Sequence, residues 1–138
     1  MLKPKAALNA EGFLLGHDPY SLPIATIGGA ISTNGVGYRA SKYGSMGEQV
    51  LGMEVVLPTG NVLKTKAIPK TSVGPALQAL FIGSEGTFGI ITQATLEIFK
   101  MPEVQNFKTF SFSDFENGFH AMVEMFSIGL IPALVDLT

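Results

Sequence analysis

The sequence predicts an α+β fold, with a mostly antiparallel sheet flanked by helices and a β-α-β unit at the carboxyl-terminal end. Three observations support this prediction. Residues 50–65 and 90–99 alternate apolar and polar side chains with the period of a strand. Stretches rich in Gly, Ser, Thr and Asn supply the turns. Residues 113–129 instead space their apolar side chains as a helix does, between two further strand-like runs.

Composition limits the class of protein. The 138 residues are 46% hydrophobic and 14% charged, which fits one domain, or one and part of a second, with a sizeable core. A net charge of −2 offers no attraction to nucleic acid or an anionic membrane. There is no cysteine, no apolar run near the roughly 20 residues of a bilayer span, and no signal-peptide core in MLKPKAALNAEG. We expect a cytoplasmic protein without a nucleic-acid partner or a membrane span.

The first half of the chain contains one clear strand pair. Residues 1–17 have no clear periodicity, and the Gly-rich residues 18–43 favour tight turns between short strands. Residues 50–65 predict a β-hairpin, because Met53, Val55 and Leu57 alternate with other residues before the turn formers 58–61.

A short helix and a strand follow the hairpin. Pro75 fits the first turn of a helix with Leu77, Leu80 and Phe81 on one face, and Gly83 fits its end. Residues 90–99 predict one strand with two faces. One face carries Ile90, Thr92, Ala94, Leu96 and Ile98, and the other carries Ile91, Gln93, Thr95, Glu97 and Phe99.

Residues 101–103 mark a boundary between 1–103 and 104–138. Beyond it, residues 107–112 and 131–137 predict strands on either side of a helix. The helix begins with the capping-box spacing of Ser113 and Glu116, and Gly129 ends it. Its apolar face carries Phe115, Phe119, Met122 and Phe126. Because a β-α-β unit of this size cannot cover its own apolar faces, we expect it to be the start of a larger domain.

The common phosphate and catalytic motifs are absent. No Lys follows a Gly with P-loop spacing, the GxGxxG pattern fails at Ala40, and a GxSxG elbow around Ser84 would need Gly in place of Ile82. His17 and His120 lack a metal-ligand spacing, so we expect no metal site.

A cofactor site made from backbone is the remaining chemical possibility. Consecutive N–H groups in Gly-rich turns can hold a pyrophosphate without a lysine. Small residues would leave room for a flat ring or a phosphate, namely Ala25, Gly28, Gly29, Ser32 and Gly35. Thr26, Thr33 and Asn34 add side-chain hydrogen-bonding groups. On the residues alone, the alternative that these glycines only make turns stays open.

Two blocks carry a family resemblance: ATIGGAISTNGVGYRASKYGSMGEQVLGMEVVLPTG at 25–60 and KTSVGPALQALFIGSEGTFGIIT at 70–92. Together they resemble the PCMH-type FAD-binding domain of the flavin oxidoreductases related to vanillyl-alcohol oxidase. The branch resembled holds D-lactate and D-2-hydroxyglutarate dehydrogenases, glycolate oxidase flavoprotein subunits and alkylglycerone-phosphate synthase. The resemblance covers roughly residues 12–103. It implies that 1–103 is the second, carboxyl-terminal subdomain of the FAD-binding domain, and that 104–138 opens a ferredoxin-like cap domain.

The resemblance also implies the site. Three stretches would face FAD: residues 18–26 beside the pyrophosphate and the flavin edge, residues 28–35 along the flavin and phosphates, and residues 85–91 around the adenosine end. The implied contacts are Pro19, Tyr20, Ser21, Leu22, Pro23, Ile24, Ala25, Thr26, Gly28, Gly29, Thr33, Asn34, Gly35, Glu85, Gly86, Gly89, Ile90 and Ile91.

Charged residues near these stretches need separate interpretation. A carboxylate beside a pyrophosphate would be repelled, so we expect Glu85 to accept hydrogen bonds from nearby N–H groups and hold the shape of its loop. Arg39 and Lys42 either contact an anionic group or form an exposed pair in a loop, and both interpretations stay open.

The implied activity is FAD-dependent oxidation of a 2-hydroxy acid of the D-lactate or glycolate type. In that chemistry a hydride passes to the flavin while a base takes the hydroxyl proton. The family's earlier PGGxS loop and later catalytic histidines have no counterpart here, and Ala76 stands where an acidic residue is common. We therefore expect no catalytic or metal-binding residue within these 138 residues, and an incomplete chain that is inactive alone.

Two alternatives remain, a segment of an alkylglycerone-phosphate-synthase-like flavoenzyme and a truncated, non-catalytic module that folds or assembles. The expected partners are FAD and a small hydroxy acid in the complete enzyme. Exposed apolar surface would favour self-association, or a partner chain that supplies the other half of the FAD-binding domain.

Overall fold

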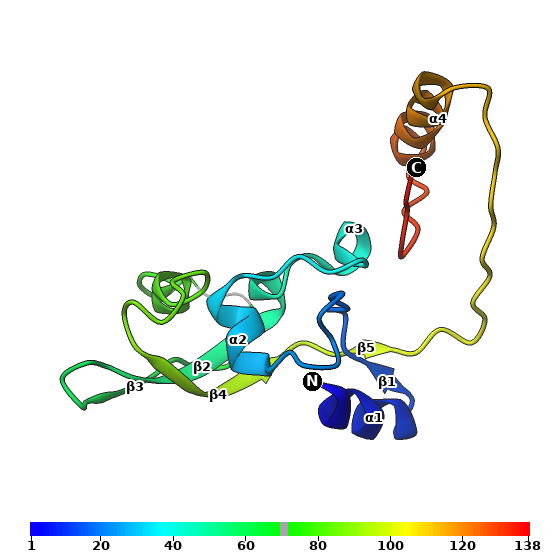
Figure 1. The fold of residues 1–138 in the computed structure, drawn as a ribbon. Helices are drawn as coiled ribbons and strands as arrows, with labels where there is room; N and C mark the ends of the chain where they lie inside the picture. Colours follow the sequence, from blue (N-terminus) through cyan, green and yellow to red (C-terminus); the bar gives the residue numbers. More distant parts are fainter. Residues whose placement is uncertain (70–71) are drawn as a thin grey trace.

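A computed structural model describes residues 1–69 and 72–138; Lys70 and Thr71, which begin the second resembling block, lie outside the described residues. The larger sheet has three strands. Figure 1 shows this sheet with a short helix on one face, and a carboxyl-terminal arm that leads to a separate helix. The elements are α1 (Leu2–Ala10), β1 (Phe13–Leu14), α2 (Ile27–Ser32), α3 (Ala40–Tyr43), η1 (Gly47–Gln49), β2 (Val50–Val56), β3 (Val62–Lys64), η2 (Leu77–Leu80), β4 (Ile90–Leu96), β5 (Phe99–Lys100) and α4 (Phe115–Ser127).

The sheet has the order β3-β2-β4, and both pairs are antiparallel, which confirms the α+β prediction. The predicted hairpin is β2 and β3, with Glu54 opposite Lys64. Its turn is closed by hydrogen bonds from Leu57 N to Asn61 O and from Gly60 N to Leu57 O, each 2.8 Å long. Gly60 has a φ of +82°, which glycine adopts without steric cost.

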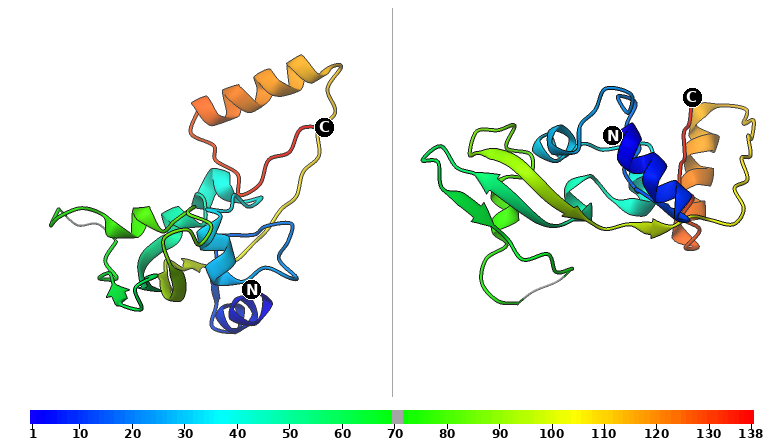
Figure 2. Two further views of the ribbon diagram at one scale, coloured as in Figure 1. Left: turned by 60° about the vertical axis from the view of Figure 1, so that its left-hand side comes forward. Right: turned by 90° about the horizontal axis from the view of Figure 1, so that it is seen from below.

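Strand β4 differs from the single regular strand that was predicted. It ends at Leu96, and Phe99 and Lys100 form β5, which pairs with β1 in a second sheet (Figure 2). A bulge leaves Thr92 without an opposite residue on β2, because Val55 pairs with Ile91 while Glu54 pairs with Gln93. The extra residue exchanges the two faces of the strand. Ile91 therefore joins the core side, and Ile90 is 70% exposed.

The core lies between α2 and the inner face of the sheet. Ile31 on α2, Val55 on β2 and Met46 are fully buried in it. Its buried members are Ala30, Ile31, Met46, Val50, Met53, Val55 and Phe81. This core holds α2 against β4, so the position of the glycines in α2 is set by packing.

Residues 18–43 form turns and two short helices, α2 and α3, and the short strands predicted there are absent from this stretch. Helix α2 starts at an N-cap, where Thr26 Oγ1 accepts a hydrogen bond from Gly29 N at 3.0 Å. Burial of Ala30 and Ile31 outweighs the helix cost of Gly28 and Gly29, about 1 kcal/mol each. The prediction of short strands here was wrong, because it used the glycine content and not the burial of residues in α2.

Two other helices also depart from expectation. Residues 2–10 form α1, which the sequence did not indicate. The helix predicted after Pro75 is the short 3-10 turn η2, with Phe81 buried just beyond it and Gly83 at a φ of +73°.

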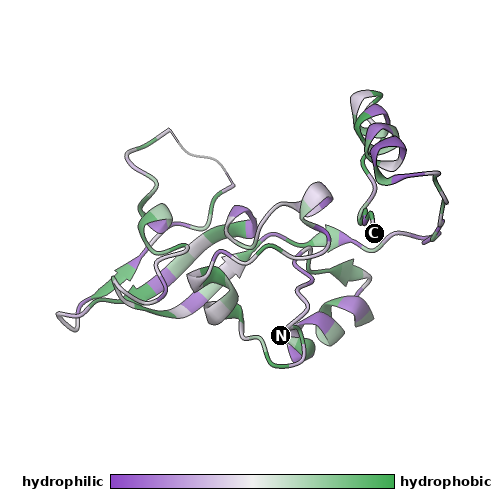
Figure 3. Cartoon of the chain, turned by 45° about the horizontal axis from the view of Figure 1, so that its top comes forward, coloured by the Kyte–Doolittle hydropathy of each residue, from purple (hydrophilic) through white to green (hydrophobic). Residues whose placement is uncertain are grey.

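The carboxyl-terminal segment contains α4, at the predicted place. Its N-cap is Asp114, one residue after the predicted Ser113, because Asp114 Oδ1 accepts the hydrogen bond from Asn117 N at 2.8 Å. Gly129 follows its end at a φ of +81°. The helix alternates hydrophobic and hydrophilic residues around its surface (Figure 3), and Phe115 and Phe119 on the predicted apolar face are exposed.

The strands predicted at 107–112 and 131–137 do not form within the described chain. A strand needs a neighbouring strand to satisfy its backbone N–H and C=O groups. Residues 131–138 instead lie along α4, where Leu137 approaches Gly118. Over the described ranges, none of the helices has both the length and the apolar character that crossing a bilayer requires.

Candidate cofactor-binding site

The two glycine-rich stretches meet at the end of α2. Gly83 N donates to Ile31 O at 3.1 Å, and Glu85 N donates to Ser32 O at 2.9 Å. These carbonyls belong to the last turn of the helix, and Ile31 O also accepts a hydrogen bond from Asn34 N at 3.0 Å. Positive φ values at Gly83, Glu85 and Gly86 let the chain fold back onto them. The loop at 83–86 is thus fixed to α2 by backbone contacts.

The loop at 18–26 leads into the other end of the same helix. It is built from turns in which Leu22 N donates to Pro19 O at 3.0 Å and Ala25 N donates to Ser21 O at 2.8 Å. The amino group of Met1 hydrogen-bonds to Ala25 O. Tyr20 is 89% exposed at the outer side of this loop. The implied contact residues therefore lie at both ends of α2, a helix about 9 Å long.

Asp18 fixes the start of this loop. Its carboxylate pairs with Lys5 of α1 at 2.8 Å and with Arg39 at 2.9 Å, and its carbonyl accepts a hydrogen bond from Tyr38 N at 3.0 Å. Burial alone would raise the pKa of Asp18. The hydrogen bonds and charges of Lys5 and Arg39 outweigh burial and hold this pKa below its ordinary value. Arg39 is therefore engaged by Asp18 and is not half of an exposed pair.

We expect Asp18→Asn to remove this acid-sensitive contact. The half-buried pairs are worth about 1–2 kcal/mol at pH 7. Because the folded-state pKa is lowered, the contribution is present above pH 3.8 and is lost as the pH falls through the folded-state pKa. Urea unfolding between pH 7 and pH 3 should show a smaller loss of stability in the variant than in the wild type. Asp136→Asn, at an exposed position, is the control, and equal acid loss in wild type and Asp18→Asn would contradict the assignment.

A buried polar contact between His17 and Gln49 fixes the chain just before the 18–26 loop. His17 N donates to Gln49 Oε1 at 3.1 Å, and Gln49 Nε2 donates to Gly44 O and Ser45 O, both at 3.4 Å. His17 and Gln49 are 2% and 1% exposed. Burial lowers the pKa of His17. Sequence reasoning assigned no role to Gln49, because a polar residue before a strand carries no sign that it will be enclosed.

Several backbone N–H groups of the predicted site already donate to other protein atoms. Those of Gly29, Thr33 and Gly35 donate to Thr26 Oγ1, Gly29 O and Ala30 O. Gly28 N donates to no atom in the described part of the chain. A Cβ at residue 28 would meet only Ile91 O, at an ordinary 3.6 Å. The structure therefore offers fewer backbone N–H groups to a phosphate than the glycine content suggested.

Glu85 does not act through its carboxylate. The side chain is exposed, and none of the hydrogen bonds or ion pairs among residues 1–69 and 72–138 involves its oxygens. Glu85 has a φ of +51°, and its N–H holds the loop to Ser32. The expectation that its carboxylate shapes the loop was wrong, and the backbone does this instead.

The last part of the glycine stretch is packed against the sheet. A Cβ at Gly89 would lie 2.7 Å from both Val55 Cγ1 and Val56 O, whereas a Cβ at Gly86 would meet nothing within 4 Å. Gly89 therefore lets β4 approach β2, and Gly86 lies in open space. Of the next two implied contacts, Ile90 faces outward and Ile91 faces the core.

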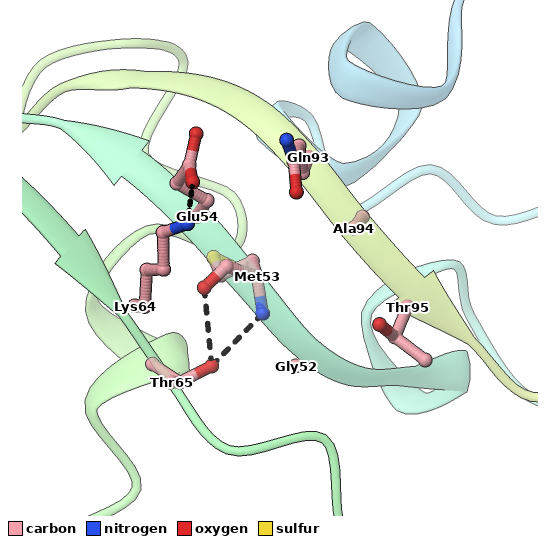
Figure 4. Close-up of a pocket in the computed structure, with 8 residues that line it drawn as sticks. All are labelled: Gly52, Met53, Glu54, Lys64, Thr65, Gln93, Ala94 and Thr95. Carbon is pink, nitrogen blue, oxygen red and sulfur yellow. Dashed lines mark hydrogen bonds and ion pairs between the residues drawn. The ribbon is translucent and has the colours of Figure 1, made fainter.

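Two shallow hollows mark the surface. One, of about 230 Å³, is lined by Tyr20, Val36, Gly37 and Tyr38, next to the 18–26 loop. The other, of about 150 Å³, lies on the sheet and includes the Glu54–Lys64 pair at 2.6 Å (Figure 4). None of the implied cofactor contacts lines the second hollow. In the described ranges, no group of three or more metal-binding side chains comes together.

Comparison with known proteins identifies the domain type. The family model of the FAD binding domain matches residues 5–66. An alkyldihydroxyacetonephosphate synthase of Caenorhabditis elegans is 40% identical over 111 residues, which cover 80% of this chain and 19% of that protein. The mitochondrial D-lactate dehydrogenase [cytochrome] 1 of Saccharomyces cerevisiae is 42% identical over 106 residues, covering 76% of this chain and 18% of that protein.

A solved structure of an alkyldihydroxyacetonephosphate synthase superposes with a TM-score of 0.81 at 28% identity. The superposition covers 96% of this chain and 24% of that one. The chain thus spans about a fifth to a quarter of the length of these relatives.

Proposed function

Because this chain belongs to the PCMH-type FAD-binding family, we propose that its loops bind FAD within a flavin-dependent oxidoreductase that oxidises a 2-hydroxy acid of the D-lactate or glycolate type. The observation that carries the proposal is that the 18–26 loop leads into one end of α2, while the 83–86 loop is hydrogen-bonded to its other end. An extended dinucleotide needs contacts spread over such a length. When bound, FAD supplies the acceptor for the substrate hydride.

We assign different tasks to the implied contact residues. The 18–26 loop and the open side of Gly28 contact one part of the cofactor, and residues 33–35 with Gly86 contact another. Gly89 and Ile91 support the site from the sheet, since both pack inward. The chain's own residues bind and orient the cofactor, and Asp18 and Gln49 hold the loops in place.

The test is a titration of the purified chain with FAD, followed by flavin fluorescence and the visible spectrum, with Gly28→Ala as the decisive variant. We expect saturable binding by the wild type and about tenfold weaker binding by the variant, since one methyl group fills the open side of Gly28. Because Ala favours a helix by about 1 kcal/mol over Gly, the variant should be no less stable.

Val62→Ala, on the exposed hairpin strand, is the control and should bind FAD as the wild type does. A folded wild-type chain that does not bind FAD would remove the proposal for this chain. Equal affinity of wild type and Gly28→Ala would remove Gly28 from the site.

A second reaction has specific support. Both the C. elegans relative and the solved structure are alkyldihydroxyacetonephosphate synthases, and in this alternative the same FAD site serves a flavoenzyme of that type. In the complete enzyme with FAD bound, anaerobic loss of the visible flavin absorbance on addition of D-lactate or glycolate would favour the 2-hydroxy acid oxidoreductase. Unchanged absorbance of that complete enzyme would favour the synthase type.

The third alternative is a non-catalytic module that assembles through apolar surface. Phe107 and Phe110 are exposed on the carboxyl-terminal arm, as are Phe115 and Phe119 on α4. A chain that stays free of FAD, and whose mass in sedimentation rises with concentration, would favour this module over the oxidoreductase.

A further inference from the structure

His17 is a buried histidine whose ring lacks a hydrogen bond. It is 2% exposed, and its Nδ1 atom is buried with no hydrogen-bond partner in the described chain. Buried polar groups are nearly always paired, since an unpaired one costs about 1–3 kcal/mol. A neutral ring tolerates this position better than a charged one does, because burying an unpaired charge is far more costly.

The surroundings of His17 contain one charged neighbour in the chain and two uncharged contacts. The charged neighbour is Asp18, whose carboxylate acts on His17 and also pairs with Lys5 at 2.8 Å and Arg39 at 2.9 Å. The other contacts of His17, Gln49 and Gly35, carry no charge. The negative charge of Asp18 opposes the lowering of the His17 pKa, but burial outweighs it and favours the neutral imidazole.

The ring lies between two segments implied in FAD binding. His17 immediately precedes the 18–26 loop. A Cβ at Gly35 would lie 3.2 Å from His17 Cε1 and 3.3 Å from Nε2, so the ring edge is in close contact with the 33–35 turn. Gly35 O in turn accepts a hydrogen bond from Met46 N at 2.9 Å. Moving the ring would move both segments.

We propose that His17 is a positioning residue for FAD that must be uncharged in the bound state, so that FAD binding releases one proton in acid. This inference rests on the proposed function. In the free chain, protonation of His17 opens the contact between the loop and the 33–35 turn. FAD then binds only after the His17 ring has lost its proton and is again in contact with the 33–35 turn. Burial of the ring lowers the pKa of His17 and so also favours the uncharged imidazole.

The first test is the Kd for FAD measured by flavin fluorescence between pH 8 and pH 5. Wild-type affinity should be constant at high pH and then weaken, approaching tenfold per pH unit, because one proton is released per FAD bound. His17→Phe keeps a ring without a titrating nitrogen and should bind with a Kd nearly independent of pH. His120→Phe removes the other histidine of the sequence, at an exposed position, and should keep the wild-type profile.

The second test needs no substitution of His17. Only two histidines occur, so NMR of the imidazole protons gives two signals, and His120→Gln assigns both. Addition of FAD should shift the titration midpoint of the His17 signal to lower pH. If FAD binds but the His17 midpoint is unchanged, or if His17→Phe keeps the wild-type pH profile, the positioning role is wrong. If the folded wild type binds no FAD at pH 8, the proposed function fails and this inference with it.

Discussion

Gly89→Ala should destabilise the fold by about 3 kcal/mol, because the new methyl group would meet both a side chain and the backbone of β2. The added Cβ would lie 2.7 Å from Val55 Cγ1 and 2.7 Å from Val56 O. Val55 is fully buried, and the carbonyl of Val56 is part of the pairing between β2 and β4. Neither atom can give way without disturbing the central strand pair. Urea unfolding followed by circular dichroism measures the effect.

Gly86→Ala is the matched control within the same glycine stretch. A Cβ at residue 86 would meet nothing within 4 Å, so only its φ of +82° opposes the substitution. The backbone cost is about 1 kcal/mol. A Gly89→Ala variant no less stable than Gly86→Ala would mean that the close approach of β4 to β2 is not required.

Gln49→Leu should also cost about 3 kcal/mol and should weaken FAD binding. Leu fills much of the same volume but leaves the N–H of His17 and the carbonyls of Gly44 and Ser45 without the amide that pairs them. Since the site is buried, water cannot easily replace these bonds. The loop that begins at residue 18 would then lose its attachment to the segment before β2.

Thermal and urea unfolding measure the stability, and titration with FAD at pH 8 measures the binding. Gln93→Leu is the matched control, because Gln93 is exposed on β4 and its loss should change stability by no more than about 0.5 kcal/mol. Similar effects of the two substitutions would show that the contact between His17 and Gln49 contributes nothing specific.

Local patterns predicted the regular elements well where neighbours in the chain decide the structure. The hairpin of β2 and β3 follows from alternation around a turn whose Gly60 has the required positive φ. Helix α4 follows from its apolar spacing and the Gly after its end. In both cases the determining residues lie within a few positions of each other.

The predictions of secondary structure were wrong where contacts with residues distant in the sequence determine the local structure. Thr92 bulges because Ile91 must face Val55, so the strand changes faces in a way that alternation alone does not reveal. Helix α2 forms in a glycine-rich stretch because Ile31 is buried against the sheet. The strands expected at 107–112 and 131–137 have no neighbouring strand within the described chain.

The sequence by itself predicted the α+β class, the resemblance to the FAD-binding family and the segments in which contacts to FAD are expected, since these depend on residue order and spacing. The placement of those contacts remains a prediction. Only the tertiary structure brought Asp18 to Lys5 and Arg39, and His17 to Gln49 and Gly35. These pairs are 13 to 32 residues apart in the sequence. Burial and pairing of polar groups depend on which distant segments pack together, and a single sequence read locally does not contain that information.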